Sequence, residues 1–502
     1  MRPRVLTLIA LLPAIAAAQT PVFMPRAIPP HAYTGGWEHF VGGGVAAFDC
    51  NGDGLPDLYV AGGEAPAQLM RNTTAGAGAA LAFVADTPDA LALTGVTGAY
   101  PLDIDGDGLL DLVILRVGAD LLMRGQGNCA FTPFETLQFE SGDHWTTAFS
   151  ATWEAGQSLP TLAFGSYVDR VNPEGPFEAC DATLLYRPEG EHYAPARRLE
   201  PGYCALSALF TDWNRTGRAD LRLSNDRHYY VRGGQEQLWA MEQTPRLYTE
   251  AEGWARFMLW GMGIAARDMN GDGFADVYLT SMGDQKFQLF NPASGGPHFE
   301  DATFARGTTA HRPYTGGDGR PSTGWHAAFG DVNNDGRDDI FVAKGNVEQM
   351  ADAAMDDPNN LLVQGADGQF VEMGEAAGIA SLHRARGAAL MDFNADGRLD
   401  LLVVNRRENL ELYENQTAGG NWLSVDLGTG ATGAIVELRS TTGVQTQEVT
   451  VGGGHASGQW GPLHFGLGAE THAEIRVQWR GEAPGEWHMF SANQLVYLAL
   501  SR

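Results

Sequence analysis

The stretch Asp-Cys-Asn-Gly-Asp-Gly-Leu-Pro-Asp at residues 49–57 decides the fold, because the chain repeats its pattern. It places oxygen-bearing side chains at positions 1, 3, 5 and 9 of a loop and a glycine at position 6, and the apolar run Leu-Tyr-Val follows at 58–60. Glycine at position 6 accepts the left-handed bend that a tight loop needs. Four more full copies begin at Asp103, Asp268, Asp331 and Asp392. A loop-and-strand unit that recurs five times predicts a repeat architecture built from β-sheets.

Two weaker copies fill the gaps between the full ones. The copy at 212 keeps Asp212, Asn214 and Asp220, but Thr216 replaces the central acid, and the copy at 153 keeps only the frame around residues 159–160. The repeats therefore start at 49, 103, 153, 212, 268, 331 and 392. These intervals suit a four-stranded propeller blade of about 40 to 50 residues together with its loops. We predict an all-β chain, a seven-bladed β-propeller followed by a small antiparallel β-domain.

Composition and the chain termini support this organisation. The 64 glycines and 25 prolines in 502 residues favour short strands joined by tight turns. The last repeat lacks an outer strand that contains Phe, whereas residues 22–25 around Phe23 supply one at the N-terminus. We therefore expect the N-terminal strand to close the propeller and remove its open sheet edges. The predicted boundaries are 19–418 for the propeller and 419–502 for the β-domain.

The acidic loops have the composition of a calcium site. Side chains at positions 1, 3, 5 and 9, together with the backbone carbonyl of position 7, form an all-oxygen cage, which Ca²⁺ prefers over softer metals. The predicted ligands are Asp49, Asn51, Asp53, Leu55 and Asp57; Asp103, Asp105, Asp107, Leu109 and Asp111; Asp268, Asn270, Asp272, Phe274 and Asp276; Asp331, Asn333, Asp335, Arg337 and Asp339; and Asp392, Asn394, Asp396, Arg398 and Asp400. We predict about five calcium ions, with a degenerate sixth site at the loop that begins at Asp212.

Two other interpretations of these loops were weighed. An EF-hand needs a bidentate Glu at position 12, but position 12 here is apolar in all five loops, for example Val60 and Ile114. The EF-hand is therefore excluded. The acids could also merely cap turns, where Asp and Asn are common. Three or four carboxylates within nine residues repel one another unless a cation neutralises them, which favours the metal.

Charge and the N-terminus indicate where the protein acts. The formal net charge of −28 excludes nucleic acid and anionic membranes as partners. Residues 1–18 have the form of a signal peptide, with Arg2 and Arg4 before an apolar run and Ala16-Ala17-Ala18 as the cleavage site. The apolar run is shorter than the roughly 20 residues of a membrane anchor, which is the alternative interpretation. We predict a secreted or periplasmic protein without a transmembrane segment after cleavage.

The chain has four cysteines, Cys50, Cys129, Cys180 and Cys204. An even number in an exported chain permits disulfides. Proximity in sequence suggests Cys180 with Cys204, and free buried thiols are the alternative.

Two segments resemble known families. The loops at 49–57, 103–111, 268–276, 331–339 and 392–400 resemble the FG-GAP or VCBS repeats of integrin-α-type propellers, and the likeness spans roughly residues 40–415. Residues 421–500 resemble the ASPIC/UnbV module through Thr-Gly-Ala-Ile-Val-Glu-Leu at 432–438 and the glycine-rich stretch 452–468. This combination is similar to the cartilage acidic protein family and its bacterial relatives. The resemblance implies a calcium-binding propeller outside the cytoplasm and no known reaction, while the degenerate loops at 153 and 212 depart from it.

Three residues of the C-terminal module could suggest a further site. His455, Trp460 and His464 lie within or beside its glycine-rich stretch. We expect them to pack inside the small β-domain instead, because short apolar and polar runs broken by glycines are typical of a compact antiparallel sheet.

Function classes can be separated by motif. The chain has no HExxH, GxSxG or GxxxxGK motif. We therefore predict a non-catalytic binding, adhesion or scaffold protein whose partner is an envelope or extracellular protein or glycan. The alternative is a secreted propeller hydrolase or lyase acting on polysaccharide, which would need acids outside the loops, for instance Glu140, Asp143 or Glu154 near His144.

Long insertions carry aromatic residues of the kind found in recognition surfaces. They include Tyr229, Tyr230, Trp239, Trp254, Trp325 and His326. The alternative for these residues is packing between blades.

Overall fold

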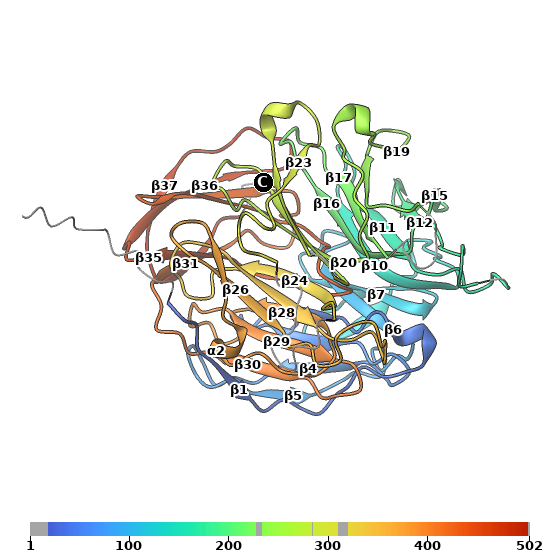
Figure 1. Ribbon diagram of the computed structural model, residues 1–502, viewed down its shortest axis with the longest axis horizontal. Coiled ribbons are helices and arrows are strands. Elements are labelled where there is room, and N and C mark those ends of the chain that lie inside the picture. The colour runs from blue at the N-terminus through green and yellow to red at the C-terminus, as the bar shows by residue number, and fades with distance from the viewer. Residues whose placement is uncertain (1–18, 174, 227–232, 284, 310–319, 500–502) are drawn as a thin grey trace, which may run out of the picture.

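The computed structural model of the 502-residue chain describes residues 19–173, 175–226, 233–283, 285–309 and 320–499, whose regular secondary structure is almost all β-strand (Figure 1). The predicted signal peptide at residues 1–18 lies outside these described residues. Among them, no helix is long and apolar enough to cross a membrane.

The strands of each sequence repeat form one antiparallel sheet, with three strands from the last repeat and four from each of the others, and the second and third sheets are joined by a short pairing of β7 with β10. In the first half of the chain they are β2 (Val45–Phe48), β3 (Asp57–Val60), β4 (Gln68–Asn72) and β5 (Phe83–Ala85); β6 (Val96–Leu102), β7 (Asp111–Gly118), β8 (Leu121–Gly125) and β9 (Phe131–Pro133); β10 (His144–Thr152), β11 (Thr161–Ser166), β12 (Thr183–Tyr186) and β15 (Arg197–Leu199); and β16 (Ala205–Thr211), β17 (Asp220–Asn225), β18 (Gln237–Ala240) and β19 (Arg246–Leu247).

The second half continues the pattern with β20 (Gly261–Arg267), β21 (Asp276–Ser281), β22 (Lys286–Phe290) and β23 (Phe299–Asp301); β24 (Gly324–Gly330), β25 (Asp339–Lys344), β26 (Asn360–Gln364) and β27 (Phe370–Glu372); and β28 (Ala385–Met391), β29 (Asp400–Asn405) and β30 (Glu411–Asn415). Outside the sheets lie the hairpin β13 (Pro188–Glu189) and β14 (His192–Tyr193), and the short helices η1 (Trp37–His39), η2 (Glu250–Glu252), η3 (Pro292–Ser294) and α2 (Gly374–Ala377).

The first strands of these sheets contact one another in a closed circle. The contacts run from β2 to β6, β10, β16, β20, β24 and β28, and β28 contacts β2 again. A circle of radially packed sheets is a β-propeller. Because each sheet is covered on both faces by its neighbours, its middle strands are apolar on both sides, as in Leu58, Tyr59 and Val60, which are all fully buried.

The N-terminal strand completes the last sheet, as the sequence predicted. β1 (Phe23–Arg26) pairs antiparallel with β30, with Phe23 opposite Asn415. Phe23 is buried, and Arg26 forms an ion pair of 2.8 Å with Glu414. The outer edge of the last sheet is therefore closed by the start of the chain.

The C-terminal residues form two small sheets with a shared core. One contains β35 (Leu463–Gly468), β31 (Asn421–Asp426) and β38 (Gln494–Tyr497), and the other β33 (Gly443–Glu448), β32 (Ile435–Ser440), β36 (His472–Gln478) and β37 (His488–Ser491). Leu423, Val436 and Phe465 are fully buried in this core. Figure 1 shows the C-terminal strands gathered at one side of the molecule.

The segment 451–460 leaves these sheets and runs among the first strands of the propeller. Isolated bridges join it to four different sheets, through the pairs Ala151–Val451, Leu209–Gly452, Ile264–Gly454 and Ala99–Ser457. Its last part, β34 (Gly458–Trp460), pairs in parallel with β2. The C-terminal module therefore fills the axis of the propeller with its own backbone.

This insertion corrects one prediction. His455 is fully buried, but its Nδ1 lies 3.1 Å from the carbonyl of Met262 and its Nε2 accepts a hydrogen bond of 3.1 Å from the amide of Gly42. Trp460 packs against the hydrophobic clusters of the first sheets. The prediction that these two residues pack inside the small β-domain is therefore wrong; they pack inside the propeller.

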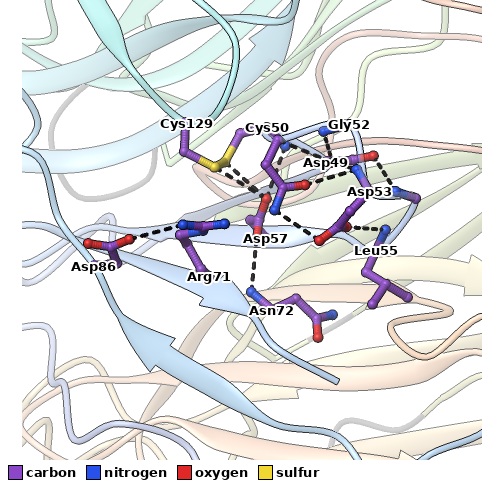
Figure 2. The surroundings of a disulfide bond; sticks show 12 residues. Asp49, Cys50, Gly52, Asp53, Leu55, Asp57, Arg71, Asn72, Asp86 and Cys129 are labelled. Carbon is purple, nitrogen blue, oxygen red and sulfur yellow. Dashed lines mark hydrogen bonds and ion pairs between the residues drawn. A yellow bond between two sulfur atoms is a disulfide. The ribbon is translucent and has the colours of Figure 1, made fainter. Parts of the chain in front are cut away.

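All four cysteines are joined. The structure contains the disulfides Cys180–Cys204 and Cys50–Cys129. The first pairing confirms the suggestion from sequence proximity, and the alternative of free thiols is wrong. The second bond links the first acidic loop to the second sheet, beside Asp57 (Figure 2).

Candidate metal sites

Each of the five full acidic loops joins the first strand of its sheet to the second. Because every sheet enters the circle in the same orientation, all five loops lie at the same end of the propeller. The repeat thus gathers the predicted ligands of each loop locally, and it does not merge different loops into one site.

The aspartate at position 9 is anchored in the same way in every loop. Asp57 accepts hydrogen bonds from the amides of Cys50 at 3.1 Å and Asn72 at 2.8 Å, one to each carboxylate oxygen. The corresponding donor pairs are Ile104 and Gly125 for Asp111, Met269 and Phe290 for Asp276, Val332 and Gln364 for Asp339, and Phe393 and Asn415 for Asp400. These five carboxylates are at most 1% exposed. Each is thereby fixed at the start of the second strand, directly under its loop.

The other acids of each loop accept hydrogen bonds from backbone amides of the same loop. Asp49 accepts from the amides of Gly52 at 2.7 Å and Gly54 at 2.7 Å, and Asp53 accepts from the amide of Leu55 at 2.9 Å. Figure 2 shows Asp49, Asp53 and Asp57 on the same side of the first loop. The same bond from the position 6 glycine to the position 1 aspartate recurs in the other four full loops. The backbone therefore holds the carboxylates together before any ion binds.

The second loop gives a direct test of whether an ion fits. One oxygen of each of Asp103, Asp105 and Asp111 lies within 4.8 Å of the others. Calcium binds oxygens at about 2.4 Å, so ligands on opposite sides of the ion are separated by about 4.8 Å. These three carboxylates accordingly have the spacing of a calcium cage. Asp57 also lies near Cys50 and Cys129, but both sulfurs are held in the disulfide and are not metal ligands.

Burial raises the pKa of these carboxylates, so that without a nearby cation the charged form is disfavoured. Removal from water, opposed in part by the backbone amides, raises the pKa of Asp111 and Asp276 to about 8 and that of Asp57 and Asp392 to about 6. The ordinary value is 3.8. A divalent cation at the loop would supply the positive charge that these groups lack.

This shift predicts an unusual pH dependence. In the calcium-free protein the folded pKa of Asp111 and Asp276 lies at about 8, above the unfolded value, so folding takes up protons between about pH 4 and pH 8. Stability without calcium should therefore fall as the pH rises through that window, while calcium affinity should rise because fewer protons compete. Melting curves in chelator at pH 6 and pH 8, with calcium titrations at both values, measure the two trends. Saturating calcium should remove the loss of stability at pH 8; a loss that persists would contradict the assignment.

In three of the loops, an arginine side chain forms ion pairs with the acids. Arg124 contacts Asp105 at 2.8 Å and Asp107 at 2.9 Å. Arg337 and Arg398 contact the position 5 acids of their own loops. These guanidinium groups reach positions 3 and 5 but not the buried acid at position 9, so they offset only part of the negative charge.

In the degenerate loop at 212, side chains of the protein bind the acid at position 9. Asp220 accepts from the indole nitrogen of Trp213 at 2.9 Å and the hydroxyl of Tyr248 at 2.8 Å, and Arg218 lies 3.2 Å away. Asp220 occupies position 9 of its loop, but its oxygens are already bonded to these three side chains. This arrangement explains in physical terms why the central acid could be lost as Thr216.

The acids proposed for the alternative enzyme, Glu140, Asp143 and Glu154, do not gather around His144 in one site. Asp143 pairs with Arg170, and His144 pairs with Asp181 at 2.7 Å. Glu154 follows the far end of β10, about ten residues from His144, which at 3.3 Å per residue places it roughly 30 Å away, and it is bound to Arg187 at 2.7 Å. Glu140 contributes a backbone carbonyl to the hydroxyl of Tyr186. The described residues therefore form no catalytic pair from this set.

The aromatic residues of the insertions are mostly interior. Trp239, Trp254 and Trp325 are at most 5% exposed, so they pack between sheets. Tyr229 and Tyr230 lie outside the described residues.

Comparison with known families agrees with the repeats. Residues 49–114 and 268–342 match the family described as FG-GAP-like repeat, and residues 427–501 match the family described as ASPIC and UnbV. The chain therefore contains FG-GAP-like repeats followed by an ASPIC and UnbV segment.

Comparison with curated proteins finds distant relatives. The chain is 26% identical to cartilage acidic protein 1 of Mus musculus over 229 residues, which covers 44% of this chain and 33% of the relative. It is 26% identical to the Homo sapiens protein of the same name over 254 residues, 47% of this chain and 36% of the relative. The chain thus spans about a third of the length of these relatives.

Among solved structures, BBS1N in complex with ARL6DN has a TM-score of 0.46 and 11% identity, covering 80% of this chain and 99% of that chain. A lectin of Agrocybe aegerita that recognises non-reducing terminal N-acetylglucosamine has a TM-score of 0.39 and 14% identity, covering 74% of this chain and 94% of that chain.

Proposed function

We propose that this chain is an exported, calcium-binding, seven-bladed β-propeller with a small C-terminal β-domain, and that it acts as a non-catalytic binding or scaffold protein of the cell envelope or extracellular space. The observation that carries the calcium proposal is the buried aspartate at position 9, which recurs in five loops with the same two amide donors. One type of ion site, repeated in five loops, accounts for all five buried carboxylates, whereas without an ion each buried carboxylate would need a separate explanation.

Calcium would supply a stable positive charge at each loop, and its role is structural. The side chains at positions 1, 3, 5 and 9 and the carbonyl at position 7 would hold it. The chain's own contribution is to fix those oxygens through backbone amides. Because the loops join the first and second strands of each sheet, an ion at each loop would tie those strands together near the axis.

Several observations support the other parts of the proposal. The circle of first strands and its closure by β1 support seven blades. The two disulfides support export, because such bonds persist in oxidising compartments. The ion pairs that separate Asp143, His144 and Glu154 support a non-catalytic role. The partner we propose is an envelope or extracellular protein or glycan.

Calcium stoichiometry tests the proposal, and the chain provides a matched pair of variants. We expect about five calcium ions per wild-type chain, about four for Asp276→Asn, and an unchanged number for Asp220→Asn. Both substitutions remove one buried charge at position 9, but only Asp276 lies in a full loop. Elemental mass spectrometry on protein equilibrated with calcium measures the ratio. A wild-type protein without calcium, or an ion lost from the Asp220 variant alone, would overturn the assignment.

A further inference from the structure

The end of the propeller opposite the acidic loops contains a pocket on its axis. The pocket has a volume of about 360 Å³ and is lined by residues from where first strands begin and second strands end. A volume of this size suits a small molecule. Because the acidic loops lie at the other end of the same strands, this pocket is separate from the candidate calcium sites.

The C-terminal module closes the floor of this pocket. Met262 and Trp325 line it, and both contact His455 from the inserted segment, Met262 through its carbonyl at 3.1 Å and Trp325 through rings whose centroids are 5.0 Å apart. The axis below the pocket is filled by residues 451–460. The pocket is therefore a blind cup that opens only at the end away from the acidic loops.

The wall of the cup is mainly apolar. Its base is formed by Tyr167, Met262, Met282 and Trp325, each at most 5% exposed. The apolar surface that a ligand can reach comes from Trp37, which is 53% exposed, and from the half-buried Phe40, Val347 and Met350. Phe40 and Tyr167 pack edge to face at 5.7 Å. Aromatic side chains give a rigid apolar surface, and methionine adapts to the shape of a ligand. The body of a ligand in this cup would be hydrophobic.

The rim of the cup is neutral, although the protein as a whole is acidic. Glu348 lies 2.7 Å from Arg406, 2.5 Å from Arg407 and 3.9 Å from Arg384, so three guanidinium groups surround one carboxylate. Asp226, on another wall, accepts a hydrogen bond of 2.5 Å from Tyr167. The four charged residues that line the cup, Arg406, Arg407, Glu348 and Asp226, have no net charge, whereas the whole chain has −28.

Only one of these guanidinium groups is placed to meet a ligand. The side chain of Arg406 is 1% exposed and donates to the carbonyl of Gly35 as well as to Glu348, so it braces the rim. The side chain of Arg407 is 48% exposed and also lines the cup. Arg407 donates one N–H to Glu348 and one to the carbonyl of Gly35 at 3.1 Å. The remaining N–H groups of this half-exposed guanidinium face the mouth of an apolar cup, where they suit a carboxylate.

We propose that this cup binds small amphipathic carboxylates, with the apolar body against Trp37, Phe40 and Val347 and the acid group at Arg407. The proposal rests on the binding role proposed above and names the class of ligand. It does not depend on the calcium loops, which lie at the opposite end.

A pair of probes that differ only in charge tests this class. We expect 1-naphthylacetate to bind with one site per chain and about fivefold more tightly than 1-naphthylacetamide, the size of effect that a half-exposed ion pair produces. Arg407→Gln should abolish this preference while the amide keeps its affinity. Arg246→Gln is the matched control, because Arg246, on the outer strand β19, is 45% exposed and pairs with Glu242 and Glu252. Isothermal titration calorimetry measures all three proteins.

A second variant tests the cup itself. Met350→Glu places a charge in the lining and should weaken both probes at least tenfold, whereas Leu382→Glu, at a residue 43% exposed elsewhere, should weaken neither. Equal affinity for the two probes, or an unchanged preference in Arg407→Gln, would show that the cup does not select carboxylates. No binding of either probe would overturn the proposal entirely. Calcium stoichiometry of the same variants should be unchanged, so failure here is distinguishable from failure of the calcium assignment.

Discussion

Chelation of calcium should lower the melting temperature by about 10 °C. Extracellular calcium sites have dissociation constants of about 10⁻⁴ to 10⁻³ M, so 10 mM calcium exceeds them by roughly 10- to 100-fold. Each site then stabilises the folded state by about 1.4 to 2.7 kcal/mol, or about 7 to 14 kcal/mol for five sites. An unfolding entropy of about 2.1 cal/mol/K per residue over about 480 residues converts this to roughly 7 to 14 °C.

Differential scanning calorimetry in 10 mM calcium and in excess chelator measures the shift. The control is the same chelator, itself saturated with calcium before it is added to the protein. This control should leave the melting temperature at the higher value. Re-addition of calcium should restore the transition, and magnesium should restore it poorly because its smaller octahedral shell suits these loops less well. An unchanged melting temperature on chelation would return the loops to the role of ordinary turns.

Replacing Gly44 by alanine should expel the C-terminal segment from the propeller axis or unfold the protein. A Cβ atom at Gly44 would lie 1.7 Å from the carbonyl oxygen of Ala456. The backbone of Gly44 has little freedom to retreat, because its amide donates to Thr97 at 3.0 Å and its carbonyl accepts from Ala61 at 3.0 Å. We expect a loss of about 3 kcal/mol or more in the free energy of unfolding, at the upper end of what overpacking costs.

Gly430→Ala provides the control for this substitution. Gly430 lies in the same C-terminal module, and a Cβ atom there would meet nothing within 4 Å. Denaturant unfolding gives the difference in free energy, and limited proteolysis shows whether residues 451–460 become accessible. If Gly44→Ala were as stable and as resistant to proteolysis as Gly430→Ala, the segment would not occupy the axis in solution.

The part of the candidate site that depends on neighbouring residues was predictable from the sequence. The spacing of Asp49, Asn51, Asp53 and Asp57 places the four side chains within one loop, whatever the rest of the chain does. The same holds for the apolar run that follows each loop, because a strand buried on both faces has to be apolar on both faces. The unpaired strand around Phe23 was recognisable for a related reason: a repeat that lacks one strand needs it from elsewhere.

Other features of the loops were not visible in the sequence. The amide donors to Asp57 include Asn72, which is fifteen residues away on the third strand. The donors to Asp220 include Tyr248, on a segment with no recognisable link to the loop. Asp57 accepts from backbone amides, whereas Asp220 is also bound by the side chains of Trp213, Tyr248 and Arg218. Spacing in the sequence does not reveal this difference.

The sequence by itself determined the all-β repeat, the position of the acidic loops and the closing strand, because each of these follows from local spacing and periodicity. Only the tertiary structure decided where His455 and Trp460 lie, that Cys50 pairs with Cys129, and that a cup lined by Trp325 and Arg407 exists. His455 meets Gly42 across 413 residues of chain. Contacts at such separations arise from how the sheets close into a circle, and a glycine-rich segment has too few side chains to show in its sequence which surface it will meet.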